Sequence, residues 1–366
     1  MKSLQATATE RTPGQPCGCS APRRGLLTGL SGLFGLGAAS LLPGCAAPAP
    51  TAPLPPRIDT HHHCFSPAYV AALDKVGQAA PVVKNWSLAQ TLDDMAKAGV
   101  GTAILSVTTP QVGFTDGPNA RRIARESNEY AARLGQDHAG KFGSFAMLPM
   151  QDTDGALREL EYALDTLKAD GIGLLTSYTD NGRDKWLGDA QFAPVLDELN
   201  RRKAILYTHP TAANCCRALQ PDVPITVIEF GTDTARTITD IVFSGTAARC
   251  PDVKFIFSHA GGTLPFITER LLKMPLQNPR LAARVPRGVL FELQRFFYDT
   301  AWSAHPGALA SLLKLVAVPQ VLFASDYPYR TGEDHVKGLL AYGFGAAEMR
   351  AIGRDNALAL MPRWRA

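Results

Sequence analysis

Three consecutive histidines, His61, His62 and His63, are the residues of this chain whose types and spacing point most directly to chemistry. They end an apolar segment that begins at Ile58, which predicts a β-strand. Successive side chains of a strand point to opposite faces, so His61 and His63 share one face and His62 lies on the other. Two imidazoles on one face can reach the same divalent cation. A histidine run alone also fits a solvated surface tract, so the interpretation depends on what recurs downstream.

Histidine or aspartate recurs where three later apolar segments end, at His209, His259 and Asp326. Five of the eight histidines therefore fall at predicted strand ends, which are a small share of the chain. Three imidazoles and one carboxylate suit a single Zn²⁺ or Mn²⁺ ion with room for water or substrate. We therefore predict a metal site with these ligands: His61, His63, His209 and Asp326.

His259 stands outside this predicted ligand set. An imidazole, with an ordinary pKa of about 6.5, both accepts and donates protons near neutral pH. We predict that His259 and Asp326 transfer a proton to or from substrate. Aromatic or basic side chains that follow strand ends are candidates for a substrate pocket, with loop packing as the alternative: Tyr178, Trp186 and Tyr327, and also Trp302 and Arg330. The remaining histidines are predicted on the surface: His138, His305 and His335.

The elements that must position these residues read as alternating strands and helices. Near-continuous apolar runs that end in polar residues are typical of parallel strands buried on both faces. They predict strands at 58–63, 102–107, 142–148, 171–177, 204–209, 254–259, 296–300 and 321–326. Amphipathic patterns predict helices at 88–98, 119–134, 154–169, 190–202, 232–248, 264–272, 306–316, 335–342 and 346–360. Strands that alternate with helices in this way predict an α/β fold, a single (β/α)8 TIM barrel, whose reactive residues lie at the carboxyl ends of its strands.

Composition fits one large globular domain. The chain has 366 residues, of which 46% are hydrophobic and 19% are charged. The net charge is only +4, and no dense basic block occurs in the body of the chain, so nucleic acid is not expected as a partner. The seven cysteines contain no CxxC pair, which argues against a structural zinc site, and they are too few to build a disulfide framework for a chain of this length.

Residues 1–45 read as an export signal. Two adjacent arginines precede an apolar stretch at 25–42, a pattern that resembles a twin-arginine signal and is short for a membrane span. The signal ends in a sequence that resembles a bacterial lipobox with Cys45 as the lipidated residue. The alternatives are a plain signal peptide and an anchor that is not cleaved. Residues 46–56 are rich in proline and alanine and predict a linker, so the barrel should occupy 57–366. The expected location is the periplasm or the outer leaflet, with membrane contact only through the lipid anchor.

These motifs together resemble the amidohydrolase superfamily, and within it the non-oxidative decarboxylases related to aminocarboxymuconate semialdehyde decarboxylase. The likeness spans residues 58–360 and rests on the polar strand ends described above. A closer likeness, to proteins similar to 6-methylsalicylate decarboxylase, is carried by the triple-histidine run and three further segments: 174–178, 185–189 and 229–234.

The resemblance implies a barrel of the metal-dependent hydrolase type that holds one divalent ion, Zn²⁺ in preference to Mn²⁺, and is usually a homodimer. It implies the same four ligands and a catalytic role for His259. Binuclear relatives use a carboxylated lysine at the end of the fourth strand, where this chain has Leu-Leu-Thr-Ser at 174–177, and this favours one metal ion. No Schiff-base or flavin signature is present, so no organic cofactor is expected.

The predicted activity is metal-dependent, non-oxidative decarboxylation of a small hydroxyaromatic or enol carboxylic acid such as 6-methylsalicylate. The substrate carboxylate and an ortho-hydroxyl would bind the metal. A proton would reach the carboxyl-bearing carbon either from Asp326 with His259 or from a metal-bound water that His259 activates. Hydrolysis of a lactone, ester or amide by the same site is the alternative, because the superfamily contains both chemistries. A surface-anchored binding protein without turnover is a third interpretation, which the intact ligand set disfavours.

Overall fold

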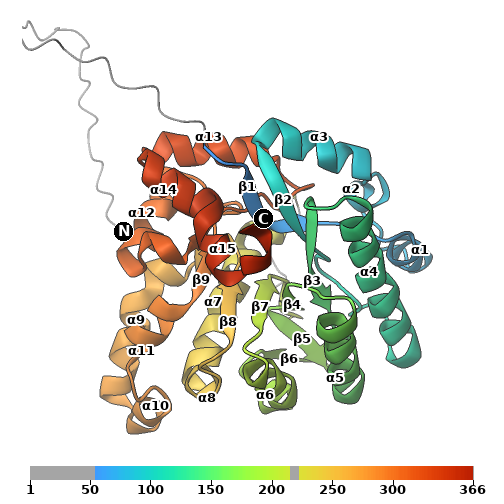
Figure 1. Ribbon diagram of the computed structural model, residues 1–366. Helices are drawn as coiled ribbons and strands as arrows, with labels where there is room; N and C mark the ends of the chain where they lie inside the picture. The colour runs from blue at the N-terminus through green and yellow to red at the C-terminus, as the bar shows by residue number, and fades with distance from the viewer. Residues whose placement is uncertain (1–53, 215–221, 366) are drawn as a thin grey trace, which may run out of the picture. The chain divides into compact units, whose positions relative to one another are not determined.

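The computed structural model describes residues 54–214 and 222–365. Parallel strands form a barrel in the order β1-β2-β3-β4-β7-β8-β9-β10 (Figure 1). The barrel strands are β1 (Arg57–His63), β2 (Val100–Ser106), β3 (Phe142–Met147), β4 (Gly171–Leu175), β7 (Ile205–His209), β8 (Lys254–Phe257), β9 (Phe297–Asp299) and β10 (Val321–Leu322). Each predicted strand overlaps one of these, so the predicted (β/α)8 barrel is confirmed. The predicted export signal and Cys45 lie outside the described residues.

The barrel closes where β1 meets the segment that begins with β10. Thr60 donates its backbone N–H to the carbonyl oxygen of Phe323 at 3.0 Å, and Asp326 donates to that of His61 at 2.8 Å. Thr60 and Phe323 are 263 positions apart in the sequence. Closure therefore brings the polar end of the first strand next to the polar residues that follow the last one.

Helices surround the barrel (Figure 1). They are α1 (Pro67–Lys75), α2 (Pro81–Lys84), α3 (Leu88–Ala98), α4 (Gly117–Asp137), α5 (Thr153–Glu161), α6 (Ala193–Arg201), α7 (Thr226–Phe243), α8 (Thr246–Arg249), α9 (Leu264–Gln277), α10 (Pro279–Arg284), α11 (Val289–Arg295), α12 (Pro306–Leu315), α13 (Gly332–Tyr342), α14 (Ala346–Arg350) and α15 (Asn356–Leu360). α3 has its predicted bounds because Ser87 caps its start and Gly99, at φ +62°, ends it. Within 54–214 and 222–365, no helix has the length and apolar character needed to cross a bilayer.

Several elements differ from the predictions. α7 begins at Thr226 and not at 232, so Glu229 and Asp233 both lie inside this helix. A two-stranded antiparallel hairpin, β5 (Ser177–Asp180) with β6 (Arg183–Trp186), follows β4 and was not predicted. The short helices α1, α2, α10 and α11 were also missed, because only a few residues carry too little periodicity to separate them from loops.

Large side chains fill the interior of the barrel beneath the polar strand ends. Tyr207 is 1% exposed, stacks on Phe145 with 5.1 Å between ring centroids, and meets the ring of His61 edge-on at 5.2 Å. Met361, just after α15, belongs to the same apolar cluster, so the end of the chain packs onto this interior. The apolar interior of the barrel therefore packs directly against the His61 ring.

The turn after β8 approaches α7 so closely that it requires glycine. Gly262 has φ +64°, and a Cβ built there would lie 1.9 Å from the carbonyl oxygen of Gly231. We expect Gly262→Ala to lower the free energy of unfolding by more than about 3 kcal/mol. Gly140→Ala is the matched control, because Gly140 also has positive φ but open space around it, and it should cost about 1 kcal/mol. Thermal or chemical denaturation measures both, and equal losses would contradict the close approach.

Candidate metal centre and active site

Four polar side chains from three parts of the barrel meet at the carboxyl ends of the strands. His61 and His63 end β1, His209 ends β7, and Asp326 follows β10. All four are buried, and one potential ligand atom from each lies within 4.8 Å of the others. The structure therefore brings together the four residues that were predicted as ligands from positions far apart in the sequence.

The contacts within this cluster fit a bound cation. The Nε2 atoms of His61 and His63 lie 3.1 Å apart and approach Oδ1 of Asp326 at 3.1 and 2.8 Å, respectively. Burial lowers the pKa of His63, and lowers that of His209 well below its usual range, so both imidazoles are neutral near pH 7 as metal ligands must be. Burial alone would raise the pKa of Asp326, but the His61 charge and hydrogen bonds from the surrounding histidines hold it well below its usual range. The set of three imidazoles and one carboxylate suits a borderline divalent ion such as Zn²⁺ or Mn²⁺.

Metal binding to this cluster should release a proton from His61. Burial alone would lower the pKa of His61, but the carboxylates of Asp326 and Asp299 outweigh burial and raise this pKa to about 10. A cation must displace that proton, so we expect release of about one proton per ion near neutral pH and an affinity that rises as pH approaches the His61 pKa. Calorimetric titration of the metal-free protein in two buffers of different ionisation enthalpy counts the protons. Binding without proton release would contradict the protonated His61.

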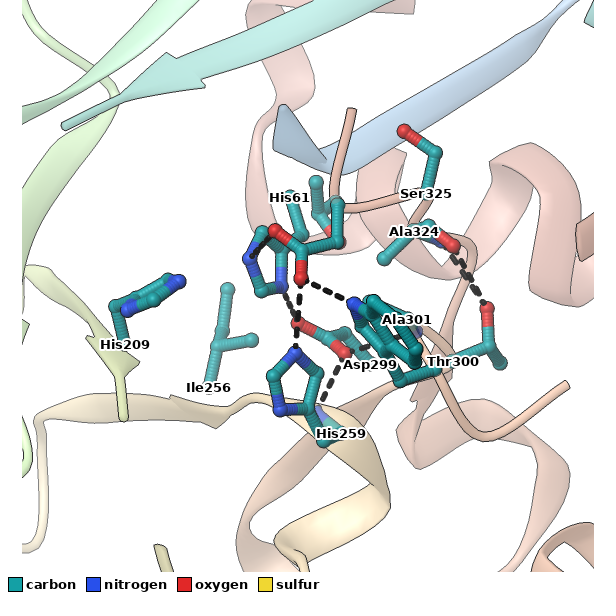
Figure 2. Close-up of polar contacts among 12 residues, drawn as sticks. His61, His209, Ile256, His259, Asp299, Thr300, Ala301, Ala324 and Ser325 are labelled. Atoms are coloured by element: carbon teal, nitrogen blue, oxygen red, sulfur yellow. Dashed lines mark hydrogen bonds and ion pairs between the residues drawn. The ribbon is translucent and has the colours of Figure 1, made fainter. Parts of the chain in front are cut away.

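His259 lies beside the ligand cluster, just after β8 (Figure 2). Its ring stacks on that of His61, with 5.2 Å between centroids and 18° between planes. Its Nε2 atom lies 3.4 Å from Oδ2 of Asp326, which is longer than a normal hydrogen bond, and has no closer partner among the described residues. This nitrogen is therefore available to exchange a proton with a molecule bound next to the cluster.

Backbone strain is concentrated at this site. His259, Ala260, Trp302 and Asp326 have φ values of 55°, 57°, 54° and 62°, respectively. This left-handed region costs a non-glycine residue about 1–2 kcal/mol and is tolerated where the surroundings hold the conformation in place. Within the part of the chain that the structure describes, four of the eight non-glycine residues with positive φ lie here. The strain marks these residues as positioned for function.

Trp302 holds the second oxygen of Asp326. Its indole N–H donates to Oδ2 of Asp326 at 2.6 Å, and its backbone N–H donates to Nε2 of His335 at 2.9 Å. The guanidinium of Arg330 lies 5.0 Å from the centre of the indole ring, which is half-exposed. His335 is 2% exposed, so its predicted surface position was wrong.

Removal of the indole N–H should lower the predicted catalytic activity without unfolding the protein. We expect Trp302→Phe to lower kcat/KM about tenfold, because Asp326 loses a charge-assisted hydrogen bond while the aromatic surface stays. Trp364→Phe is the matched control, since its indole N–H also donates to an aspartate, Asp170 at 2.9 Å, at the opposite end of the barrel. Steady-state kinetics of both variants test this, and an equal effect of the two substitutions would contradict a specific role for Trp302.

The three residues predicted to bind substrate all contact other residues of the protein, two through hydrogen bonds and one through stacking. The Tyr178 hydroxyl accepts a backbone N–H of β4 at 2.9 Å, and the Trp186 indole donates to Asp233 at 2.8 Å. Tyr327 stacks on His62, with 4.9 Å between ring centroids. His62 is buried and its Nδ1 lies 3.0 Å from an oxygen of Asp59, apart from the ligand cluster as expected. Contact of the three aromatic residues with a substrate stays a prediction.

Asp299 is a site residue that the sequence analysis missed. It ends β9, is fully buried, and lies 2.9 Å from Nδ1 of His61. A signal for it was present, because a carboxylate after the apolar start of a predicted strand follows the same pattern that singled out His209 and Asp326.

A closed (β/α)8 barrel with three imidazoles and a carboxylate at its strand ends defines a metal-dependent enzyme of the amidohydrolase class. Residues 58–363 match the family model described as Amidohydrolase, and the chain belongs to this family.

Within the family, the chain groups with decarboxylases, as its motifs predicted. It is 38% identical over 330 residues to decarboxylase macB of Penicillium terrestre. This alignment covers 84% of this chain and 96% of that protein. It is 34% identical over 314 residues to a 6-methylsalicylic acid decarboxylase of Penicillium expansum, in an alignment that covers 84% of this chain and 96% of that protein. A solved dihydroxybenzoic acid decarboxylase of Polaromonas sp., with bound manganese and the inhibitor 2-nitroresorcinol, has a TM-score of 0.73 at 22% identity over 86% of this chain and 98% of that one. The structural likeness supports the barrel fold.

Proposed function

We propose that this protein is a metal-dependent, non-oxidative decarboxylase of a small hydroxyaromatic carboxylic acid similar to 6-methylsalicylate. The observation that carries the proposal is the convergence of His61, His63, His209 and Asp326 beside Nε2 of His259. This nitrogen lies 3.4 Å from Oδ2 of Asp326 and makes no hydrogen bond within the described residues. The activities named for the relatives at 34% and 38% identity support the reaction and the substrate class.

The proposed cofactor is one divalent ion held by the four-residue cluster, Zn²⁺ in preference to Mn²⁺. When bound, such an ion anchors a carboxylate and an ortho-hydroxyl and stabilises negative charge on the substrate. The manganese in the Polaromonas structure supports Mn²⁺ as the second candidate. No organic cofactor is required, because the electrons that leave the broken carbon–carbon bond return to the substrate's own ring.

The residues of the chain supply the proton. His259 donates from Nε2 to the ring carbon that bears the carboxylate, and Asp326 Oδ2, 3.4 Å away, stabilises the protonated imidazole. Protonation interrupts the aromatic ring at that carbon. The bond to the carboxylate then breaks, its electron pair restores the ring, and CO2 leaves. The stacking of His259 on His61 and the strained backbone keep the imidazole aimed at this position.

We further propose that the enzyme is an exported homodimer, anchored through Cys45. The export signal and the lipobox-like sequence support the location, and the family resemblance supports the dimer. Light scattering of the purified protein tests the dimer. Mass spectrometry of the membrane fraction tests acylation of Cys45, and an unmodified, soluble mature protein would exclude it.

A substrate screen tests the reaction class. The metal-loaded protein is incubated with 6-methylsalicylate, salicylate and dihydroxybenzoates, and in parallel with an aromatic lactone and an aryl ester. The proposal predicts release of CO2, with 3-methylphenol as the product from 6-methylsalicylate. Hydrolysis of the lactone or ester with no CO2 from any of the acids would favour the alternative hydrolase.

A further inference from the structure

Asp299 contacts both halves of the active site. Its carboxylate is fully buried, and its two oxygens face different groups (Figure 2). Oδ2 lies 2.9 Å from Nδ1 of His61, while Oδ1 accepts the backbone N–H of His259 at 2.8 Å and that of Ala301 at 3.1 Å. One side chain on β9 therefore links a ligand on β1 to the histidine that follows β8.

All the groups that face Asp299 act as hydrogen-bond donors. The backbone N–H groups of His259 and Ala301 can only donate. His61 must then carry a proton on Nδ1 to bond with Oδ2. In the neutral form of His61, after a cation has displaced the second ring proton, Nδ1 keeps the one remaining proton and Nε2 has a free lone pair. Nε2 is the atom that faces His63 and Asp326.

The hydrogen bond from the His259 backbone N–H to Asp299 also supports a strained backbone conformation. His259 has φ +55° and the following Ala260 has φ +57°, a conformation that needs external support. The bond from the His259 N–H to Oδ1 provides such support at the residue whose side chain must face the substrate.

We propose that Asp299 is a positioning residue with two separable tasks. One oxygen fixes the tautomer of His61 that binds the metal, and the other holds the backbone of His259 in its left-handed conformation. The inference rests on the proposed function only in treating His259 as the proton carrier. Its tests measure metal affinity and amide exchange, so they stand even if the substrate is different.

Asp299→Asn separates the two tasks. An amide has one accepting oxygen and one donating NH2 group. The oxygen should remain with the N–H groups of His259 and Ala301, because these cannot change their hydrogen-bonding role. The NH2 group then faces His61 and favours the tautomer that carries its proton on Nε2. We expect the metal dissociation constant to rise about 10- to 100-fold, while the His259 amide stays protected from hydrogen exchange.

Asp299→Ala should lose both tasks. With neither oxygen present, we expect the same loss of metal affinity together with fast exchange of the His259 amide. Competition with a chromophoric chelator measures the affinity for Zn²⁺, and hydrogen exchange of the segment 257–262 measures the second effect. Wild-type metal affinity in a folded Asp299→Asn protein overturns the first task, and a still-protected amide in Asp299→Ala overturns the second.

Asp170→Asn is the matched control. The Asp170 side chain is 1% exposed and accepts the backbone N–H of Ser144 at 3.0 Å, but it precedes β4 and so lies at the amino end of the barrel. This variant should lose stability without losing metal affinity. Equal loss of affinity in both asparagine variants would mean that Asp299 acts only through general stability and would overturn the proposal.

A measurement on the unmodified protein covers the case in which Asp299 variants fail to fold. Spectra of the zinc-loaded protein with ¹⁵N-labelled histidine should contain a protonated Nδ1 signal that disappears in His61→Ala. A His61 ring that carries its proton on Nε2 would overturn the tautomer assignment.

Discussion

Turnover should fall about a thousandfold in His259→Asn while the protein keeps one metal ion per chain. Asparagine tolerates the left-handed backbone at this position and retains the N–H that bonds to Asp299, but its amide cannot exchange a proton. His259→Ala should lose turnover to the same extent. The measurements are kcat for CO2 release and metal content by mass spectrometry.

His138→Asn is the control for this substitution, because His138 follows α4 and lies outside the site. It should leave kcat unchanged. Loss of metal in His259→Asn, in step with loss of activity, would contradict the role of His259 as proton donor, since it would then be a metal ligand.

Asp326→Asn should abolish both metal binding and turnover. Oδ1 of Asp326 faces the Nε2 atoms of His61 and His63, and Oδ2 accepts the indole N–H of Trp302. An amide places its NH2 group at one of these two positions, where it either meets the metal ligands or opposes the Trp302 donor. The negative charge that the cation needs is also lost. We expect a fall of about a thousandfold or more in activity that excess metal does not restore.

A partly buried aspartate outside the cluster provides the control. Asp240 accepts the backbone N–H of Gly188 at 2.7 Å from within α7, and Asp240→Asn should leave metal content unchanged. Metal analysis after dialysis and the CO2 assay compare the two variants. One ion per chain in Asp326→Asn would contradict its place among the ligands.

The barrel and the ligand cluster were predictable because both depend on local patterns. Buried parallel strands read as apolar runs, and the barrel fold places every strand's carboxyl end on one face. His61, His209 and Asp326 could therefore be grouped from three distant segments without knowledge of their contacts. The alternation of side chains along β1 also separated His62, which bonds to Asp59, from its two neighbours.

The parts that escaped prediction depend on tertiary contacts. Asp299 ends a predicted strand and Trp302 was a pocket candidate, but their hydrogen bonds to His61 and Asp326 join different elements of the barrel, and no local pattern encodes those partners. His335 lies on a helix that looks exposed, yet its ring accepts a bond from Trp302 and is buried. The start of α7 was predicted at 232 and lies at Thr226, because the first turns of this helix carry no strong start signal in the sequence.

The most direct test of the central claim is the rate of CO2 release from carboxyl-labelled 6-methylsalicylate as metal is added to the metal-free protein. We expect no release without metal and a rate that rises linearly until one ion is bound per chain. CO2 release at full rate from metal-free protein would contradict the metal-dependent site, and no release at any metal content, from this acid or from the dihydroxybenzoates, would contradict the proposed decarboxylation.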